Sequence, residues 1–402
     1  MDKDGSIVLD PALALKPKTL RVRVSVDGAI TGTSQLAVAS HLEKQSLEQS
    51  IQQARDSLLE EELYYEMSLE TRHLLAYGVE LRDSVIQVDA PQMGNTSQVR
   101  KLLIDCIPRD DPIASSQGHE LDWLARNVAE ALRLLLAHEH SMRLYRRSQL
   151  PPPLTSRTRE KPPPPLLRTL LAVFRHIESV DSLYSYLGSV ANTLDGAGLG
   201  VVLDTTRETS WAKLGDSLKM SSNKGLSTTD QLLEIFMKPF DGRATLTLLT
   251  MTGAQTESLT IVTRTIIGQP TFGTEHKLTL PSAMASDLGL FQQQKFATVD
   301  EVKSYLDWII SLHLAHRILK SEYSSRSAIK SQEPRLTIRS QDGKKGTTSS
   351  RDIQVELNEG GLRVGMLAVD APFETANPDQ SYTWNGTQGE VSLREVVNDW
   401  VG

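Results

Sequence analysis

Histidine side chains on two expected helices are the residues of this 402-residue chain whose types and spacing could bind a metal. His138-Glu139-His140 departs from the zinc motif H-E-x-x-H, and histidines two apart on a helix point roughly 200° apart, so they do not readily share an ion. His313 and His316 could face together, but no carboxylate or cysteine stands at ligand spacing beside them. We therefore expect these histidines at the margins of core stripes.

Cys106 is the only cysteine, which excludes an internal disulfide and a thiolate zinc cluster. Its flank Ile107-Pro108 matches no thiol-protease motif, so we expect a small, buried, apolar side chain.

One glycine-rich run, Gly196-Ala197-Gly198-Leu199-Gly200, invites comparison with the dinucleotide fingerprint G-x-G-x-x-G. Val201 stands where the last glycine belongs, and the run follows an expected helix instead of a strand. A nucleotide-dependent enzyme using this loop stays as an alternative, but we expect a turn, no cofactor, no metal and no catalytic residues.

Composition sets the broad class. The chain is 39% hydrophobic and 23% charged with a net charge of −7, and no run approaches the roughly 18–20 apolar residues of a membrane span. The start MDKDGSIVLD lacks the basic and apolar regions of a signal peptide. We expect a cytosolic or nuclear protein that binds no membrane.

The elements that would position any site begin with a strand. Leu20, Val22, Val24 and Val26 alternate with polar residues, and Asp27-Gly28 follows as a turn. Such a strand needs a sheet, so either a later segment pairs with it or the chain is part of a longer protein.

The longest helix signal runs from Leu42 to Tyr77 without glycine or proline, and Gly78 follows as a C-cap. At roughly 1.5 Å per residue this helix would exceed about 50 Å, more than a small sheet can cover. Its apolar residues spread over more than one face, which favours a partner outside the chain. The residues expected to contact partners are Leu47, Ile51, Leu58, Tyr64 and Tyr65, together with Arg146 and Arg147 further along the chain.

The order helix, strand, strand, helix occurs twice, so we predict an α+β fold of two related halves with small antiparallel sheets and similar strand order. A C-terminal β hairpin or meander and a short helix complete it. The expected segments are an N-terminal arm with one strand (1–40), a first half (41–150), a proline-rich spacer (151–165), a second half (166–330) and the C-terminal hairpin with its helix (331–402).

Two basic stretches, 143–168 and 317–351, support an alternative function as a nucleic-acid-binding module. The first has seven bases against one acid and the second nine against three, but aromatic residues hardly interleave them. We expect solvated surface or contacts with an acidic partner, and no direct DNA binding.

Two segments carry a resemblance. Ile51–Val88 contains A-R-D-S-L-x-E-E-E-L, E-x-x-x-E and a Y-G-V turn, and Ala129–Leu154 contains R-L-L-L-x-H and R-R-x-Q-x-P-P-P. Both resemble the C-terminal half of the fungal Mediator subunit 17 family, a component of the Mediator head module. Together they cover about a sixth of the chain, and we can name no resemblance for 194–227.

This resemblance implies a non-catalytic scaffold in the nucleus. The family binds other head subunits and helps to couple activators to RNA polymerase II and the general initiation factors. It has no catalytic residues or cofactor to carry over.

Overall fold

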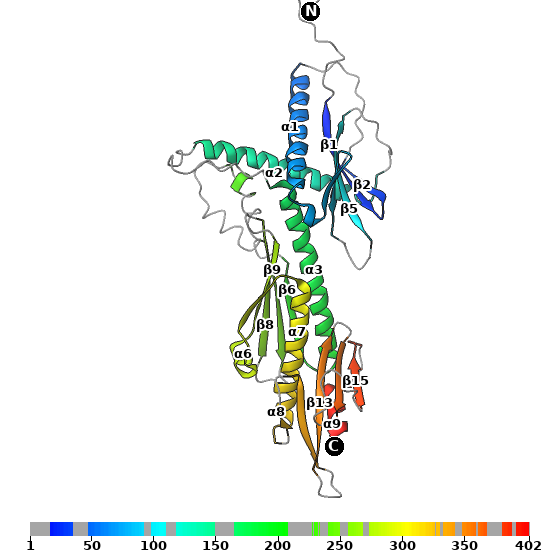
Figure 1. Ribbon diagram of the computed structural model, residues 1–402, viewed down its shortest axis with the longest axis vertical. Helices are drawn as coiled ribbons and strands as arrows, with labels where there is room; N and C mark the ends of the chain where they lie inside the picture. The colour runs from blue at the N-terminus through cyan, green and yellow to red at the C-terminus, as the bar shows by residue number, and fades with distance from the viewer. Residues whose placement is uncertain are drawn as a thin grey trace, which may run out of the picture. The chain divides into compact units, whose positions relative to one another are not determined.

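In a computed structural model the chain divides into two compact units, Met1–Phe174 with Gly215–Lys238, and Arg175–Leu214 with Pro239–Gly402 (Figure 1). The residues it describes are 17–34, 47–91, 98–109, 118–148, 165–207, 227, 229–231, 233, 240–249, 256–267, 273–325, 327–329, 333–341, 348–358, 361–367, 380–387 and 391–401.

The first unit is built on a five-stranded antiparallel sheet of order β2-β1-β5-β4-β3. β1 (Lys18–Val26) turns into β2 (Ala29–Thr33) through Asp27 and Gly28, whose φ angles are +50° and +87°. β5 (Arg100–Pro108) pairs with the whole of β1, so a later segment supplies the partner that the opening strand needed.

The valines and leucine of Val79–Val88 predict one strand that pairs with the next, Val99–Ile107. The segment is instead a tight hairpin of β3 (Val79–Arg82) and β4 (Val85–Asp89). Asp83 and Ser84 form its turn with φ angles of +47° and +61°, a geometry usually marked by Asn-Gly or Asp-Gly. The glycine signal is missing, which is why the sequence did not reveal the turn. β4 pairs with β5, as expected.

Two helices, α1 (Leu47–Thr71) and α2 (Asp122–Ser148), pack against β1 (Figure 1). The expected extension of α1 to Tyr77 is wrong. The chain leaves the α-helix after Thr71 through bonds from His73 N–H to Glu70 C=O and Leu74 N–H to Thr71 C=O. A short 3₁₀ turn (Leu75–Tyr77) follows, and Gly78 caps it with φ +78°, as predicted. The expected start at Leu42 lies outside the described residues. The 25 residues described as α1 span about 37 Å, a length that does not by itself call for a partner.

α3 (Leu166–Gly196) begins in the first unit and continues in the second. The second unit has an antiparallel meander of order β10-β9-β8-β7-β6, formed by β6 (Val201–Thr206), β7 (Phe240–Leu249), β8 (Thr256–Ile266), β9 (Gly273–Thr279) and β10 (Gln293–Phe296). A short helix, α6 (Ser282–Leu288), lies between β9 and β10 in the chain.

The spacing of Thr298 and Glu301 in the sequence predicts a capping box, and α7 (Val299–His313) begins with this capping box at Thr298. A π-helical segment (Leu314–Leu319) and α8 (Lys320–Glu322) continue it. A second sheet of this unit, order β11-β12-β13-β14-β15, packs on α7. Its strands are β11 (Ser327–Ala328), β12 (Arg335–Gln341), β13 (Thr348–Asn358), β14 (Gly361–Leu367) and β15 (Gln380–Trp384).

The α+β class with small antiparallel sheets is confirmed, as are the C-terminal meander and the short amphipathic helix α9 (Leu393–Val401). The expectation of similar strand order in the two halves is wrong. The first sheet takes β1 between β2 and β5, whereas the second is a simple meander. Because β1 comes from the segment expected to be an arm, counting helices and strands alone could not show this difference.

The five-segment division stays a prediction. Its spacer, 151–165, lies outside the described residues apart from Pro165. None of the described helices is long and apolar enough to cross a bilayer.

Candidate functional site

An apolar stripe on the outer side of α1 is the most distinctive surface of the first unit. Ile51, Leu58 and Tyr65 are 48%, 65% and 62% exposed, and Ala54 between them is exposed as well. The steps of three, four and seven residues place these four side chains along one line of the helix, like the seam of a coiled coil. We call Ile51, Ala54, Leu58 and Tyr65 the α1 stripe.

The opposite side of α1 faces the core. Ser57, Glu60, Leu63 and Met67 are buried there, and at about 100° per residue their mean direction is about 155° from that of the α1 stripe. Two of these side chains hold the beginning of β1, which β2 does not reach, since Lys18 N–H donates to Ser57 Oγ (2.8 Å) and Leu20 N–H donates to Glu60 Oε2 (2.8 Å). These bonds fix the rotation of α1, so the α1 stripe has to face outward.

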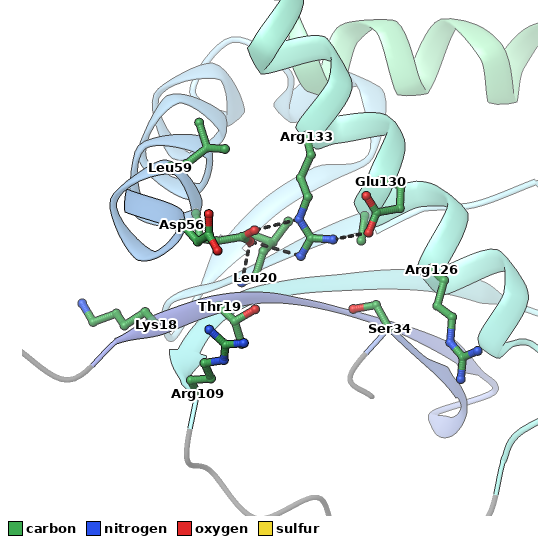
Figure 2. A pocket seen from close by; sticks show the side chains of 12 residues that line it. Lys18, Thr19, Leu20, Ser34, Asp56, Leu59, Arg109, Arg126, Glu130 and Arg133 are labelled. Carbon is green, nitrogen blue, oxygen red and sulfur yellow. Dashed lines mark hydrogen bonds and ion pairs between the residues drawn. The ribbon is translucent and has the colours of Figure 1, made fainter. Parts of the chain in front are cut away.

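A polar cleft of about 590 Å³ lies between α1, α2 and the start of β1 (Figure 2). Arg133 of α2 crosses it to reach Glu60, with Nε–Oε1 at 2.7 Å and Nη2–Oε2 at 3.2 Å, and its Nη1 also donates to Glu130 at 2.6 Å. Lys18, Arg109 and Arg126 add cationic side chains to the lining.

The polar groups of this cleft mainly connect α1, α2 and β1 to one another. Its central carboxylate is neutralised by Arg133, and the Ser34 hydroxyl accepts from Val22 N–H at 2.9 Å. None of the described residues lining it is a histidine or a cysteine. Glu60 belongs to the acidic run Glu60-Glu61-Glu62, and such a run of charges in a helix predicts a solvated or partner-facing side. Glu60 is 9% exposed, because it satisfies both the β1 edge and Arg133.

A second carboxylate of α1 caps the start of α3. Glu70 accepts the backbone N–H groups of Leu166 (3.1 Å), Leu167 (2.7 Å) and Arg168 (3.0 Å), which are among the first, otherwise unpaired donors of that helix. Burial raises the pKa of Glu70 to about 7, although the three N–H donors act in the opposite direction.

The residues predicted to contact partners have different environments. Ile51, Leu58 and Tyr65 lie on the α1 stripe, whereas the Tyr64 hydroxyl donates to Ser84 C=O at 2.6 Å. Leu47 is the first residue of α1, and its side chain lies outside the described part of the structure. Their roles in binding stay predictions.

Arg146 and Arg147 lie in the last turn of α2 and are exposed. Arg146 contacts Glu139 at 3.2 Å, and the neighbouring Arg143 contacts Glu139 at 3.4 Å and Glu66 at 3.5 Å. In the second basic stretch, Arg351 donates to Trp400 C=O at 2.9 Å. Several cations of both stretches therefore have partners within the chain. Counting basic residues in the sequence therefore overestimates the unpaired positive charge on the described surface.

The histidines serve as buried or paired groups. His138 Nδ1 lies 3.2 Å from Asp230 Oδ1, and His140 Nε2 lies 2.9 Å from Glu62 Oε1, so the two face different carboxylates. His313 lies inside the core and not at its margin, and burial, with Arg317 nearby, lowers its pKa to about 4. Among the described residues, no group of three or more His, Cys, Asp or Glu side chains could hold a metal ion.

The other two candidates of the sequence are structural. The glycine run turns α3 into β6, with Gly198 at φ +76°. Cys106 is half-buried instead of fully buried, because it lies two residues from the end of β5, and burial raises the pKa of its thiol to about 11.

Comparisons with known proteins agree on one family. Residues 1–194 match the family model described as subunit 17 of the Mediator complex. The chain is 32% identical over 339 residues to "Mediator of RNA polymerase II transcription subunit 17" of Aspergillus oryzae, covering 83% of this chain and 50% of that protein. It is 28% identical over 413 residues to the protein of the same name in Aspergillus terreus, covering 98% and 62%. The chain therefore spans about half to three-fifths of the length of these relatives.

A solved structure, the Schizosaccharomyces pombe Mediator head module, contains a chain with a TM-score of 0.46 and 12% identity, covering 74% of this chain and 60% of that one. A likeness at this level does not decide the fold. The family match does include both segments that carried the resemblance, Ile51–Val88 and Ala129–Leu154. The chain belongs to the family of subunit 17 of the Mediator complex.

Proposed function

We propose that this chain is a non-catalytic scaffold subunit of the Mediator head module and acts in the nucleus as part of a transcription coactivator. The relatives it matches carry the name of a Mediator subunit of RNA polymerase II transcription, which supports this role. Its proposed partners are other head subunits, and it reaches RNA polymerase II and the general initiation factors through the complex.

The observation that carries the proposal is the α1 stripe. Burying a large apolar side chain stabilises a protein by about 1.5 to 3 kcal/mol, so three of them exposed in line on one helix favour association. The bonds from Ser57 and Glu60 to β1 prevent α1 from turning these side chains inward. A partner surface is therefore the expected cover.

The proposed partner element is a helix. Spacings of three, four and seven residues suit the ridges of a second helix packed nearly parallel or antiparallel to α1. Glu48, Glu61 and Glu62 border the α1 stripe together with Arg55. Glu61 also pairs with Lys18 at 3.6 Å and Glu62 lies 2.9 Å from His140, which leaves Glu48 as the acid of this border that a partner can meet most freely. A partner helix with basic residues beside its own apolar seam would match this border.

The test replaces two residues of the α1 stripe, Ile51→Asp with Leu58→Asp. Both side chains are exposed, so the isolated chain should keep its helical circular dichroism and its melting temperature. Co-purification with the other head subunits should fall at least tenfold, because two carboxylates would have to enter an apolar seam.

The matched control is Leu134→Asp with Leu144→Asp, two exposed leucines of α2. The control should leave co-purification unchanged. If the α1 variant co-purifies normally, the stripe is not a partner surface. If both double variants lose their partners equally, the effect is not specific to α1.

A further inference from the structure

The second unit carries an open aromatic hollow of about 700 Å³ where β10 leads into α7. Three aromatic side chains line it, Phe296 at the end of β10 and Tyr305 and Trp308 on α7. Asp300 and Glu301, from the first turn of α7, line it as well. The hollow lies in the other unit from the α1 stripe and is independent of the proposed scaffold role.

The rings form a continuous surface and leave no slot between them. The ring centroids of Phe296 and Tyr305 are 5.1 Å apart with a tilt of 46°, and those of Tyr305 and Trp308 are 5.6 Å apart with a tilt of 40°. These are contact distances for aromatic pairs. A ligand group cannot enter between the rings, but a flat group can stack on their open side.

The polar atom of Tyr305 does not take part in this surface. Its hydroxyl is buried and has no hydrogen-bond partner among the described side chains and backbone. Burial also raises the pKa of Tyr305. The hollow therefore offers the π-face of Tyr305 and not its hydroxyl.

One of the two carboxylates, that of Asp300, is open to solvent. Glu301 Oε2 accepts Ala297 N–H (3.0 Å) and Thr298 N–H (3.3 Å), so that oxygen is committed to the start of α7. Asp300 is 92% exposed in its side chain, and its ion pair with Lys303 is long, at 3.9 Å. A cation that reaches the rings would find the carboxylate of Asp300 at the rim.

We propose that this hollow binds an arginine side chain presented by a partner polypeptide. A guanidinium is flat and stacks on aromatic faces, and its N–H fork donates to a carboxylate at the same time. An unmodified lysine ammonium is compact and strongly hydrated, so it gains less from the rings. A trimethylated lysine needs rings set around it and has no N–H for Asp300.

The test uses four short peptides that differ at one position, Gly-Ser-X-Ser-Gly with X as arginine, citrulline, lysine or trimethyl-lysine, with both ends blocked. Binding to the full chain is followed by ligand-observed NMR. Citrulline is the decisive comparison, because it keeps the shape of arginine and loses its charge. The arginine peptide should bind at least about fivefold more tightly than the citrulline peptide.

Two variants probe the hollow itself. Asp300→Asn should weaken arginine binding about threefold and Trp308→Leu about fivefold. Trp123→Leu, at an exposed tryptophan of the first unit, is the matched control and should have no effect. If Trp308→Leu lowers the melting temperature, the proposal is judged by Asp300→Asn alone. The Asp300 side chain is almost fully exposed, so this change should not disturb folding.

The proposal is overturned if citrulline binds as tightly as arginine, if trimethyl-lysine or lysine binds more tightly, or if Asp300→Asn behaves like the Trp123→Leu control.

Discussion

Glu70 allows a quantitative test of how α1 is joined to α3. Burial raises the pKa of its carboxyl from 4.5 to about 7, in spite of the three N–H groups of α3 that it accepts. Because the folded pKa lies above the unfolded one, the folded state favours the protonated form. Its contribution to stability is complete below pH 4.5 and is lost as the pH rises to about 7. A shift of that size corresponds to about 3 kcal/mol.

The perturbation is Glu70→Gln, which keeps an acceptor oxygen and removes the titration. At pH 5 the variant and the wild type should have similar free energies of unfolding. By pH 8 the variant should be the more stable of the two by about 3 kcal/mol. The assay is urea denaturation between pH 5 and 8, with an NMR titration of the Glu70 carboxyl carbon as the direct reading of its pKa.

Glu48→Gln, at an exposed glutamate of the first turn of α1, is the control for removing one carboxylate from this helix. The reasoning is refuted if the wild type gains stability relative to Glu70→Gln as the pH rises. That result would mean that the three backbone donors outweigh burial and hold the pKa of Glu70 below 4.5.

Three further predictions concern stability. Glu60→Ala should lower the free energy of unfolding of the first unit by about 3 kcal/mol, because Leu20 N–H loses its acceptor and Arg133 its buried partner. In the same denaturation experiment the neighbouring Glu61→Ala should change it by no more than about 0.5 kcal/mol. Equal effects of the two variants would contradict the pairing of Glu60 with Leu20 and Arg133. Ser84→Gly should stabilise the β3–β4 hairpin by about 0.5 to 1 kcal/mol by relieving a left-handed φ of +61°, and a lower denaturation midpoint would count against this turn geometry. Thr298→Ala should lower the free energy of unfolding by about 1 kcal/mol, because the α7 capping box is lost, whereas Thr298→Ser should stay close to wild type. Equal melting temperatures of these two variants would disprove the role of the cap.

Much of the fold could be predicted where the pattern is local and strong. The alternation Leu20 to Val26 marks β1, and Thr298 with Glu301 marks the start of α7, because each signal lies within a few residues of what it specifies. The hairpin turn at Asp83-Ser84 could not be predicted, since its positive φ angles occur without the glycine that usually marks them.

The site shows the same limit. The apolar positions Ile51 and Leu58 were visible in the sequence, but periodicity alone did not tell which side of α1 faces the core. The deciding contacts, Glu60 with Leu20 N–H and with Arg133, join residues 40 and 73 positions apart. Glutamate is usually exposed and leucine usually buried, but on α1 Glu60 is buried and Leu58 is exposed. Glu60 can be buried because its carboxylate pairs with groups that are far away in the sequence.

The aromatic hollow was also missed. Phe296 closes a four-residue strand that carried no clear pattern, and Tyr305 and Trp308 resemble ordinary core positions of an amphipathic helix. Only the fold brings the three rings and Asp300 to one place.

Photo-crosslinking from position 58 in the assembled complex tests the central claim most directly. A photoreactive amino acid replaces Leu58, and a second sample carries it at Leu134 on α2 as the comparison. If the α1 stripe is the partner surface of a scaffold subunit, position 58 should crosslink to a helical segment of another head subunit, with several-fold higher yield than position 134. Crosslinks from position 58 only within this chain, or to no protein at all, would contradict the claim.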